Sequence, residues 1–525
     1  MEKRTLLAIA LAFAILLVYQ YFFIKPETQK IRKPVKVEKK EEAKPVAPVE
    51  RVIPEIMPSE EKEIRIETDL YSAVFTTRGA TLKHYELKKY KDKDGRNVML
   101  LKAPVIEPPL ATGSKDDFDL SEVSFNVHDY RGEGIKLGDD IKSASLTFEY
   151  ANSGISIRRQ YTFHNNDYKI EIKDDVSGLP DYWITLGIDF GIHDTKDRST
   201  HIGPVLLKDT DRIELDAKKL NETKIYKDSL KWIAQEDKYF FSSLIPLSTM
   251  EEAKAWKLKD SPIIAFRGRP NTNSFILYAG PKEYDRLKAL NVGLEHIIDF
   301  GFFSVIAVPL FWILKLFHKL IGNYGWAIVL LTVIVRIPFI PLVNKSQKAM
   351  KKMQEIQPRL AEIKEKYKKD PQRMQKEMME IYKKHKVNPV GGCLPILLQI
   401  PVFFALYKIL LITIELRGAP FMLWIKDLSA PDTLFGHLPS WLPIIGGFAV
   451  GPLPLLMGVT MVIQQKMTPT SLDPAQNKMM MLMPIIFTFL FLNFASGLVL
   501  YWLMNNIFSI VQQFYVNKKV AKKGT

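Results

Sequence analysis

The strongest constraint on this chain is a run of 39 residues, Met479–Asn517, that contains no charged side chain. A bilayer core about 30 Å thick is crossed by about 20 helical residues, each rising about 1.5 Å. As a single helix the run would be nearly twice too long. We therefore expect it to cross twice, as residues 479–494 and 497–516, and to turn back at Asn493–Gly497.

Four further stretches are apolar enough to cross a bilayer: Thr5–Ile24, Trp326–Val343, Cys393–Ile414 and Trp441–Ile463. A fifth, Phe302–Phe317, is short and ambiguous. If it also crossed, the basic segment Asn344–Gly392, with fourteen Lys and Arg against six acids, would lie outside the cell. Basic loops favour the cytosol, so we expect this stretch to lie flat on the outer surface. Six crossings then leave both termini in the cytosol.

The rest of the chain divides by composition. The first span lacks a small-residue cleavage site and is predicted to be an uncleaved anchor. A Pro-, Lys- and Glu-rich segment follows, and then a region of strand-like alternation. The predicted parts are an anchor at 1–24, a disordered tether at 25–61, an antiparallel β-sandwich domain at 62–290, an interfacial helix at 299–319, a five-helix membrane core at 322–516 with a cytosolic helical hairpin at 344–388, and a basic tail at 517–525.

Two observations support the β and hairpin predictions. Apolar residues alternate on both sides of Asn165-Asn166, which predicts two strands joined by a turn. In the basic segment, apolar residues recur at intervals of four and three: Ala349, Met353, Ile356, Leu360, Ile363 and Tyr367, then Met374, Met378 and Ile381. Such stripes predict two packed helices. Whether the hairpin only packs on itself or also touches substrate, anionic lipid or ribosomal RNA stays open.

Motifs for catalysis are missing from the sequence. A single cysteine, Cys393, excludes an intrachain disulfide and a cysteine-based zinc site. There is no Walker loop and no HExxH sequence, and the histidines of the β region lack ligand spacing. We therefore expect no metal, no cofactor and no enzymatic activity.

Polar residues within the predicted spans are informative because they are costly in hydrocarbon. Eight of them stand out: Thr332, Arg336, Gln399, Thr460, Gln464, Asn505, Ser509 and Gln512. With the topology above, all eight fall in the cytosolic half of the bilayer. This predicts a wet groove that is open to the cytosol and sealed on the outside, whereas a channel would need polar residues along its full length.

Arg336 is the most informative of these residues. A mid-span arginine costs about 2.5–3.5 kcal/mol on insertion scales, and no span offers an acidic partner. Its side chain could reach the cytosolic interface by snorkelling, or it could supply a fixed positive charge to the groove. Pro338 and Pro341 are expected to disrupt the helix just beyond it.

Four motifs in this order resemble the YidC membrane insertase family: Leu331-Thr332-Val333-Ile334-Val335-Arg336, Lys386-Val387-Asn388-Pro389-Val390-Gly391-Gly392-Cys393-Leu394-Pro395, Leu455-Leu456-Met457-Gly458-Val459-Thr460-Met461 and Ser496-Gly497-Leu498-Val499-Leu500-Tyr501-Trp502. The resemblance implies a bacterial inner-membrane protein whose periplasmic domain is a galactose-mutarotase-like supersandwich without catalysis.

The resemblance also implies a mechanism. The groove would take the polar tail of a nascent membrane protein, and the transmembrane segment would leave along the third and fifth spans. Arg336 would be the groove's charge, Thr332 a groove contact and Trp502 an aromatic substrate contact. The Sec translocon is an implied partner, the ribosome and anionic lipids are candidate partners, and no nucleotide is consumed.

Two other functions remain as alternatives. A small-solute transporter would predict inverted repeats and a site at the membrane midplane, and we see no such repeat. A membrane-anchored enzyme that modifies sugars would need an acid/base pair in the β domain, and none stands out.

Overall fold

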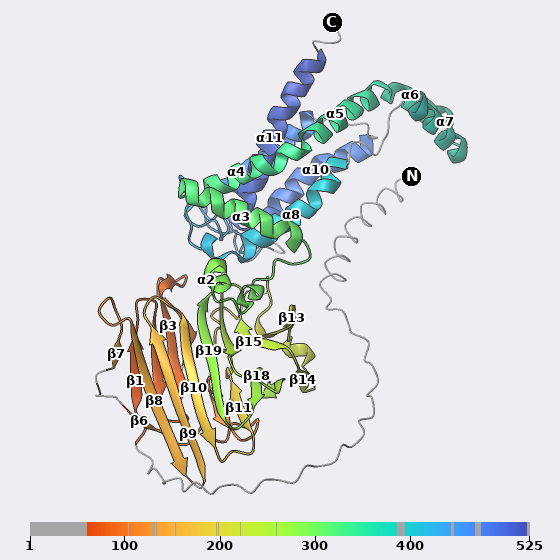
Figure 1. Ribbon diagram of the computed structural model, residues 1–525. Helices are drawn as coiled ribbons and strands as arrows, with labels where there is room; N and C mark the ends of the chain where they lie inside the picture. Colours follow the sequence, from red (N-terminus) through yellow and green to blue (C-terminus); the bar gives the residue numbers. More distant parts are fainter. Residues whose placement is uncertain are drawn as a thin grey trace, which may run out of the picture. The chain divides into compact units, whose positions relative to one another are not determined.

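The computed structural model describes residues 60–385, 394–442, 446–467 and 474–521, except positions 103, 105, 129–131, 133, 153, 196, 198, 221 and 259. The predicted anchor, most of the tether, the motif at 386–393 and the last residues of the basic tail lie outside the described residues. Within the described part, a β-rich region is followed along the chain by a helical region (Figure 1).

The described strands form three sheets, and neighbouring strands in each sheet are hydrogen-bonded in the following order. The first contains β4 (Asn97–Leu101), β3 (Thr81–Lys91), β2 (Tyr71–Thr76), β1 (Glu63–Glu67) and β7 (Ile135–Lys136). The second contains β13 (Asp211–Glu214), β12 (Gly203–Lys208), β15 (Leu230–Glu236), β16 (Phe240–Pro246), β19 (Thr272–Pro281), β10 (Lys169–Ser177), β9 (Ile155–His164), β8 (Ser143–Asn152) and β6 (Asn126–His128). The third contains β14 (Lys224–Lys227), β17 (Glu252–Leu258), β18 (Ser261–Gly268), β11 (Tyr182–Thr185) and β5 (Thr112–Gly113).

The alternation around Asn165-Asn166 produces the expected hairpin. Strands β9 and β10 pair antiparallel, with Phe163 opposite Ile170 and Tyr161 opposite Ile172. Asn166 adopts a φ of 58°, a left-handed conformation that asparagine tolerates in turns. One pairing departs from the predicted antiparallel domain: β1 and β7 run parallel, which the short β7 permits because it adds only two residues to the sheet edge.

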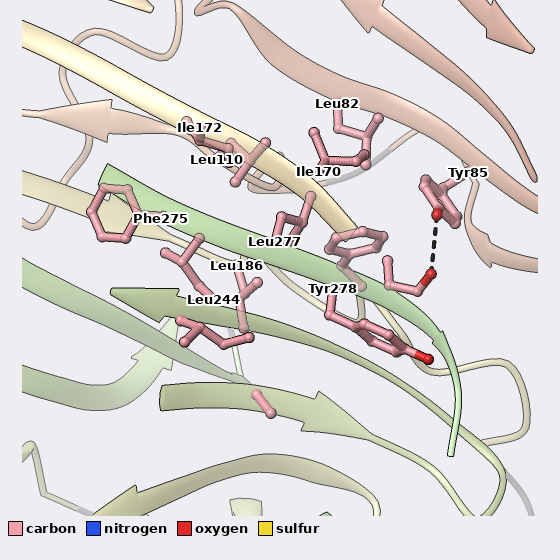
Figure 2. Packing of buried hydrophobic residues seen from close by; sticks show 14 of the residues in the cluster. Leu82, Tyr85, Leu110, Ile170, Ile172, Leu186, Leu244, Phe275, Leu277 and Tyr278 are labelled. Carbon is pink, nitrogen blue, oxygen red and sulfur yellow. Dashed lines mark hydrogen bonds between the residues drawn. The ribbon is translucent and has the colours of Figure 1, made fainter. Parts of the chain in front are cut away.

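All three sheets contribute to one apolar core. The buried side chains include Leu82 of β3, Ile170 of β10 and Phe266 of β18. Figure 2 shows part of this core, where the Tyr85 hydroxyl also donates to the Ala279 carbonyl oxygen at 3.0 Å. This hydrogen bond links the first sheet to the second and satisfies a buried phenol.

A buried ion pair joins the neighbouring strands β9 and β10. Arg159 of β9 lies directly opposite Asp174 of β10, and their side chains are 1% and 0% exposed. Arg159 donates from Nε to Asp174 Oδ1 at 2.8 Å and from Nη1 to the Leu110 carbonyl oxygen at 2.7 Å. The Tyr182 hydroxyl of β11 donates to Asp174 Oδ2 at 2.6 Å. Both charges are therefore desolvated but fully engaged in hydrogen bonds.

The helical region contains, in chain order, α2 (Tyr284–Ala289), η2 (Leu294–Ile297), α3 (Ser304–Ile321), α4 (Tyr324–Arg336), η3 (Ile337–Phe339), α5 (Ile340–Glu355), α6 (Gln357–Lys366), α7 (Pro371–Lys384), α8 (Leu394–Ile412), η5 (Ile414–Leu416), α9 (Pro452–Met467), α10 (Pro474–Phe491) and α11 (Ser496–Ala521). The prolines after Arg336 act as expected, because α4 ends at Arg336 and gives way to the 3₁₀ turn η3.

Among the described residues, two helical stretches pass a test of length and hydropathy for spanning a membrane. They are Ser304–Ile321 and Tyr324–Glu355, and shorter apolar helices lie at Gln399–Ile412 and Met480–Phe491. The first of these is the helix that the sequence places flat on the membrane surface. Its length alone would allow a crossing, so its interfacial position stays a prediction.

The fourth predicted span requires a correction. The sequence placed its start at Trp441, but α9 begins only at Pro452. Gly447 adopts a φ of 80°, which a helix cannot accommodate. A Cβ on Gly451 would collide with the Asp432 carboxylate, so the close approach of these two segments also requires glycine. The described residues 441, 442 and 446–451 therefore belong to the loop before α9.

The last two helices and the basic hairpin lie close to where the sequence predicts them. Helix α10 ends at Phe491 and α11 begins at Ser496, so the chain turns within the predicted segment. In the hairpin, Met353, Ile356 and Leu360 form a small buried cluster. Partly buried side chains of α7 pack against it: Met378, Ile381 and Tyr382. The apolar stripes thus meet as their spacing predicts.

We predict that Asp174→Ala lowers the free energy of unfolding of the β domain by about 3–5 kcal/mol, because it leaves Arg159 buried and unpaired. The double substitution Arg159→Leu with Asp174→Leu should cost much less, since no unpaired charge remains. Hydrogen exchange of the β9 and β10 amides in the purified full chain measures both values. Equal losses in the two variants would contradict the prediction.

Candidate functional site

The guanidinium of Arg336 is held by side chains and backbone of α11. Its Nη1 donates to the Asn505 carbonyl oxygen at 2.8 Å and to Asn505 Oδ1 at 2.9 Å, and its Nη2 donates to Gln512 Oε1 at 3.0 Å. All three acceptors are neutral. Within the described part of the chain, no carboxylate forms an ion pair with Arg336. The site therefore retains a full positive charge.

Gln512 links the guanidinium of Arg336 to helix α5. Its Oε1 accepts from Arg336, while its Nε2 donates to Asn344 Oδ1 of α5 at 2.8 Å. Arg336, Asn344, Asn505 and Gln512 are called the Arg336 cluster below. All four side chains are half-buried, so they are neither sealed in the core nor freely exposed. The cluster unites α4, α5 and α11 at the end of α4.

A second polar contact, on the other side of α11, was missed by sequence reasoning. Asn506 Nδ2 donates to Thr460 Oγ1 of α9 at 3.2 Å, and Gln513 Nε2 donates to the Met467 carbonyl oxygen. Neighbouring helical residues point about 100° apart, whereas residues seven apart share a face. The repeated pairs Asn505-Asn506 and Gln512-Gln513 were the available signal, because such pairs place polar groups on two faces.

Three other predicted residues bond to groups other than the guanidinium, two of them within their own helix and Gln399 to a neighbouring helix. The Thr332 hydroxyl is buried and donates to the Ile328 carbonyl oxygen of its own helix at 2.7 Å. The Ser509 hydroxyl donates to the Asn505 carbonyl oxygen at 2.8 Å, next to Arg336. Gln399 of α8 donates to the Tyr501 hydroxyl at 2.5 Å. Only Ser509 therefore adjoins the cluster directly, and Gln464 lies half-buried on α9.

Trp502 lies among aromatic rings of two other helices. Its ring centroid is 5.0 Å from that of Phe403 on α8, and 5.2 Å and 6.3 Å from those of Phe491 and Phe487 on α10. The four rings, called the aromatic cluster below, close the contact between α8, α10 and α11. The third and fifth predicted spans therefore meet at the residue that sequence motifs singled out.

Polar and apolar residues occupy different halves of the helices. In α4, α9 and α11 the fully buried apolar residues come first, and they end at Leu331, Met457 and Leu503. The polar residues follow from Thr332, Thr460 and Asn505 onward. In α8 the order is reversed, with Gln399 ahead of the buried segment from Val402 to Ile412. One half of the helix bundle is thus mainly apolar, apart from Lys408 of α8, which forms an ion pair with Asp299, and the other half carries the polar contacts of Arg336 and α11.

Nothing in the described residues suggests a metal centre, since no group of three His, Cys, Asp or Glu side chains could hold an ion.

Comparison with known proteins places this architecture in a family. Residues 63–313 match the family model of the YidC periplasmic domain, and residues 316–523 match that of the 60Kd inner membrane protein. A relative from Pelobacter propionicus, named membrane protein insertase YidC, is 41% identical over 560 residues, which cover 99% of this chain and 100% of the relative. The chain belongs to the YidC family.

A second relative of the same name, from Geotalea uraniireducens, agrees with this assignment and is 40% identical over 99% of this chain and 100% of its own. A crystal structure of an active YidC insertase is 21% identical and covers 88% of this chain and 95% of that chain, with a TM-score of 0.38. By the two family models, the β-rich region is the periplasmic domain of an inner-membrane protein, and the helical region is its membrane part.

We predict that the polar half of α11 is reached by water and the apolar half is not. In a chain whose single cysteine is replaced (Cys393→Ser), a membrane-impermeant thiol reagent applied from the cytosolic side should modify Ser509→Cys. Val499→Cys, at a fully buried position of the same helix, should stay unmodified and serves as the matched control. Equal modification at both positions would contradict the division into a wet and a dry half.

Proposed function

We propose that the chain is a membrane protein insertase that receives nascent membrane proteins from the cytosol and releases them into the bilayer. The relatives carry the name of that activity over their full length. The observation that supports the proposal best is the Arg336 cluster, a half-buried cation with only neutral partners among the described residues, at the boundary between the polar and apolar halves of the bundle.

The proposed topology has six spans, with both termini in the cytosol and α3 lying in the outer interface. The positive-inside rule supports it, because the basic hairpin of α5, α6 and α7 then faces the cytosol. The domain limits proposed from the sequence apply here, with the β domain at 62–290 and the membrane core at 322–516. This orientation opens the polar half of the bundle toward the cytosol and turns the dry half outward.

In the proposed groove, Arg336 attracts acidic or polar segments of a client. At 4 Å, opposite unit charges attract by about 4 kcal/mol at an effective dielectric constant of about 20, against about 1 kcal/mol in water. A carboxylate of the client would therefore gain more from Arg336 than from an exposed arginine. Thr460, Gln464 and Ser509 would line the groove, with Thr332 and Gln399 at its edge.

The aromatic cluster supports release along α8 and α10. Aromatic rings there pack against one another without hydrogen bonds that must be broken, so they can part for an apolar client helix. Trp502 would then contact the departing segment. This is the lateral route that the third and fifth spans are expected to provide.

The proposed partners follow from this mechanism. The nascent chain is the client, and the Sec translocon, the ribosome and anionic lipids are proposed as partners of the basic hairpin or the membrane core. We expect no nucleotide and no cofactor. The alternative of a small-solute transporter finds no support in the comparisons.

We predict that Arg336→Ala reduces insertion of clients with acidic outer segments about tenfold more than insertion of neutral clients, which corresponds to about 1.4 kcal/mol of selective attraction. Arg336→Lys keeps the charge and should preserve most of the preference. Reconstituted proteoliposomes and two clients that differ only in the acidic residues measure the ratio. Equal impairment of both clients would reject charge attraction as the function of the cluster.

A second prediction concerns Gln512. Gln512→Glu places a carboxylate on the guanidinium and neutralises it without removing the arginine, so it should reproduce the selective loss of acidic clients. Gln512→Leu removes the same hydrogen bond without adding charge, and acidic clients should insert at least as well as neutral ones. The same insertion assay applies, and identical behaviour of the two variants would exclude an electrostatic cause.

A further inference from the structure

The loop between α8 and α9 contains a hydrogen-bonded hairpin. Backbone hydrogen bonds join its two arms: Phe435 N–H donates to the Val450 carbonyl oxygen at 2.9 Å, and Leu438 N–H donates to that of Phe448 at 2.8 Å. An antiparallel bridge links His437 to Ala449 between them. The described residues 434–442 and 446–450 are called the 434–450 hairpin below. Its cross-arm bonds satisfy backbone groups that a loose loop would leave to water.

Three of the exposed side chains of this hairpin are large and apolar, and they lie beside the exposed His437, Pro439 and Ser440. Leu434, Phe435 and Trp441 are 53%, 61% and 78% exposed. From Thr433 to Gln465 the sequence contains no Asp, Glu, Lys or Arg. Clustered exposed apolar side chains mark interaction sites, and a water-facing loop would normally carry charge. The surface is therefore suited to a partner that is itself apolar.

The length of α9 identifies that partner. The helix has 16 residues and so spans about 24 Å, while the hydrocarbon core is about 30 Å thick. The chain directly before Pro452 must then lie at the level of the outer leaflet. Irregular backbone is tolerated at that depth only when its polar groups are paired, and the hairpin meets this condition.

The hairpin is also fixed to the helix ends. Asn493, in the turn between α10 and α11, accepts from Ala449 N–H through Oδ1 at 3.2 Å. Asp432, just before the hairpin, accepts from Leu453 N–H at 2.9 Å and from Trp424 Nε1 at 3.0 Å. The exposed side chains are thus held at a set position relative to α9, α10 and α11.

We propose that the 434–450 hairpin is an anchor that inserts Leu434, Phe435 and Trp441 into the outer leaflet at the level of the lipid headgroups. Tryptophan favours this interface because its ring is apolar and its indole N–H can hydrogen bond. The anchor holds the outer ends of α9, α10 and α11 at a defined depth. The inference rests on the proposed topology, which puts this loop on the outer side, and not on the charge of the Arg336 cluster.

The test uses the full chain in the Cys393→Ser background, reconstituted into vesicles of phosphatidylethanolamine and phosphatidylglycerol. Ser440→Cys, beside Trp441, carries an environment-sensitive fluorophore, and some lipids are brominated in the upper acyl chain. We expect blue-shifted emission that the brominated lipid quenches. The control is Ile141→Cys, at a residue that is 53% exposed on the β domain, where we expect water-like, unquenched emission.

Three outcomes would overturn the anchor. Water-like emission at position 440 would place the hairpin in solvent, and blue-shifted emission without quenching would show that protein covers it. Quenching that persists after Leu434→Ser, Phe435→Ser and Trp441→Ser together would show that these side chains are not the anchor. Labelling of Lys426→Cys, at an exposed position earlier in the same loop, by an impermeant reagent from the outside tests the topology separately, so failure of the topology is distinguishable from failure of the anchor.

Discussion

The positive charge of Arg336 is the constraint on which the helical region depends. A guanidinium within an apolar bundle needs hydrogen-bond acceptors, and α11 supplies three of them from Asn505 and Gln512. These contacts fix α11 against the end of α4, while Gln512 extends the network to α5. Because the acceptors are neutral, they satisfy the geometry of the guanidinium without cancelling its charge.

Arg159 and Arg336 have the same side-chain chemistry but different partners. Arg159 faces Asp174 in the β domain, so its charge is neutralised and the pair contributes to a fixed core. Arg336 lacks such a partner among the described residues and stays half-buried. The second arrangement suits the proposed function, in which a charge that no carboxylate neutralises attracts an acidic segment of a client.

Helix α11 organises the bundle through its two polar faces. One face meets Arg336, and the other meets Thr460 of α9 through Asn506. Its first half is apolar and forms part of the buried cluster, with Tyr501 and Trp502 at the transition. One helix thus joins the dry half, the aromatic cluster and the polar half, which explains why its sequence is uncharged over its whole membrane length yet rich in amides.

Much of this protein follows from its sequence. Apolar lengths predicted the helices α4, α8, α10 and α11, and the alternation around Asn165-Asn166 predicted the pairing of β9 with β10. Arg336 was singled out because a lone charge in an apolar stretch is conspicuous. Hydropathy could not place the start of α9, since the segment from Trp441 is as apolar as a span, yet Gly447, Phe448 and Val450 pair with residues 435–438 in a hairpin. It also could not show that Asn506 and Gln513 matter, or that Thr332 bonds within its own helix. Periodicity reports which residues avoid water, but the partner of each polar group depends on how neighbouring helices are rotated and packed, and only the tertiary structure decides that.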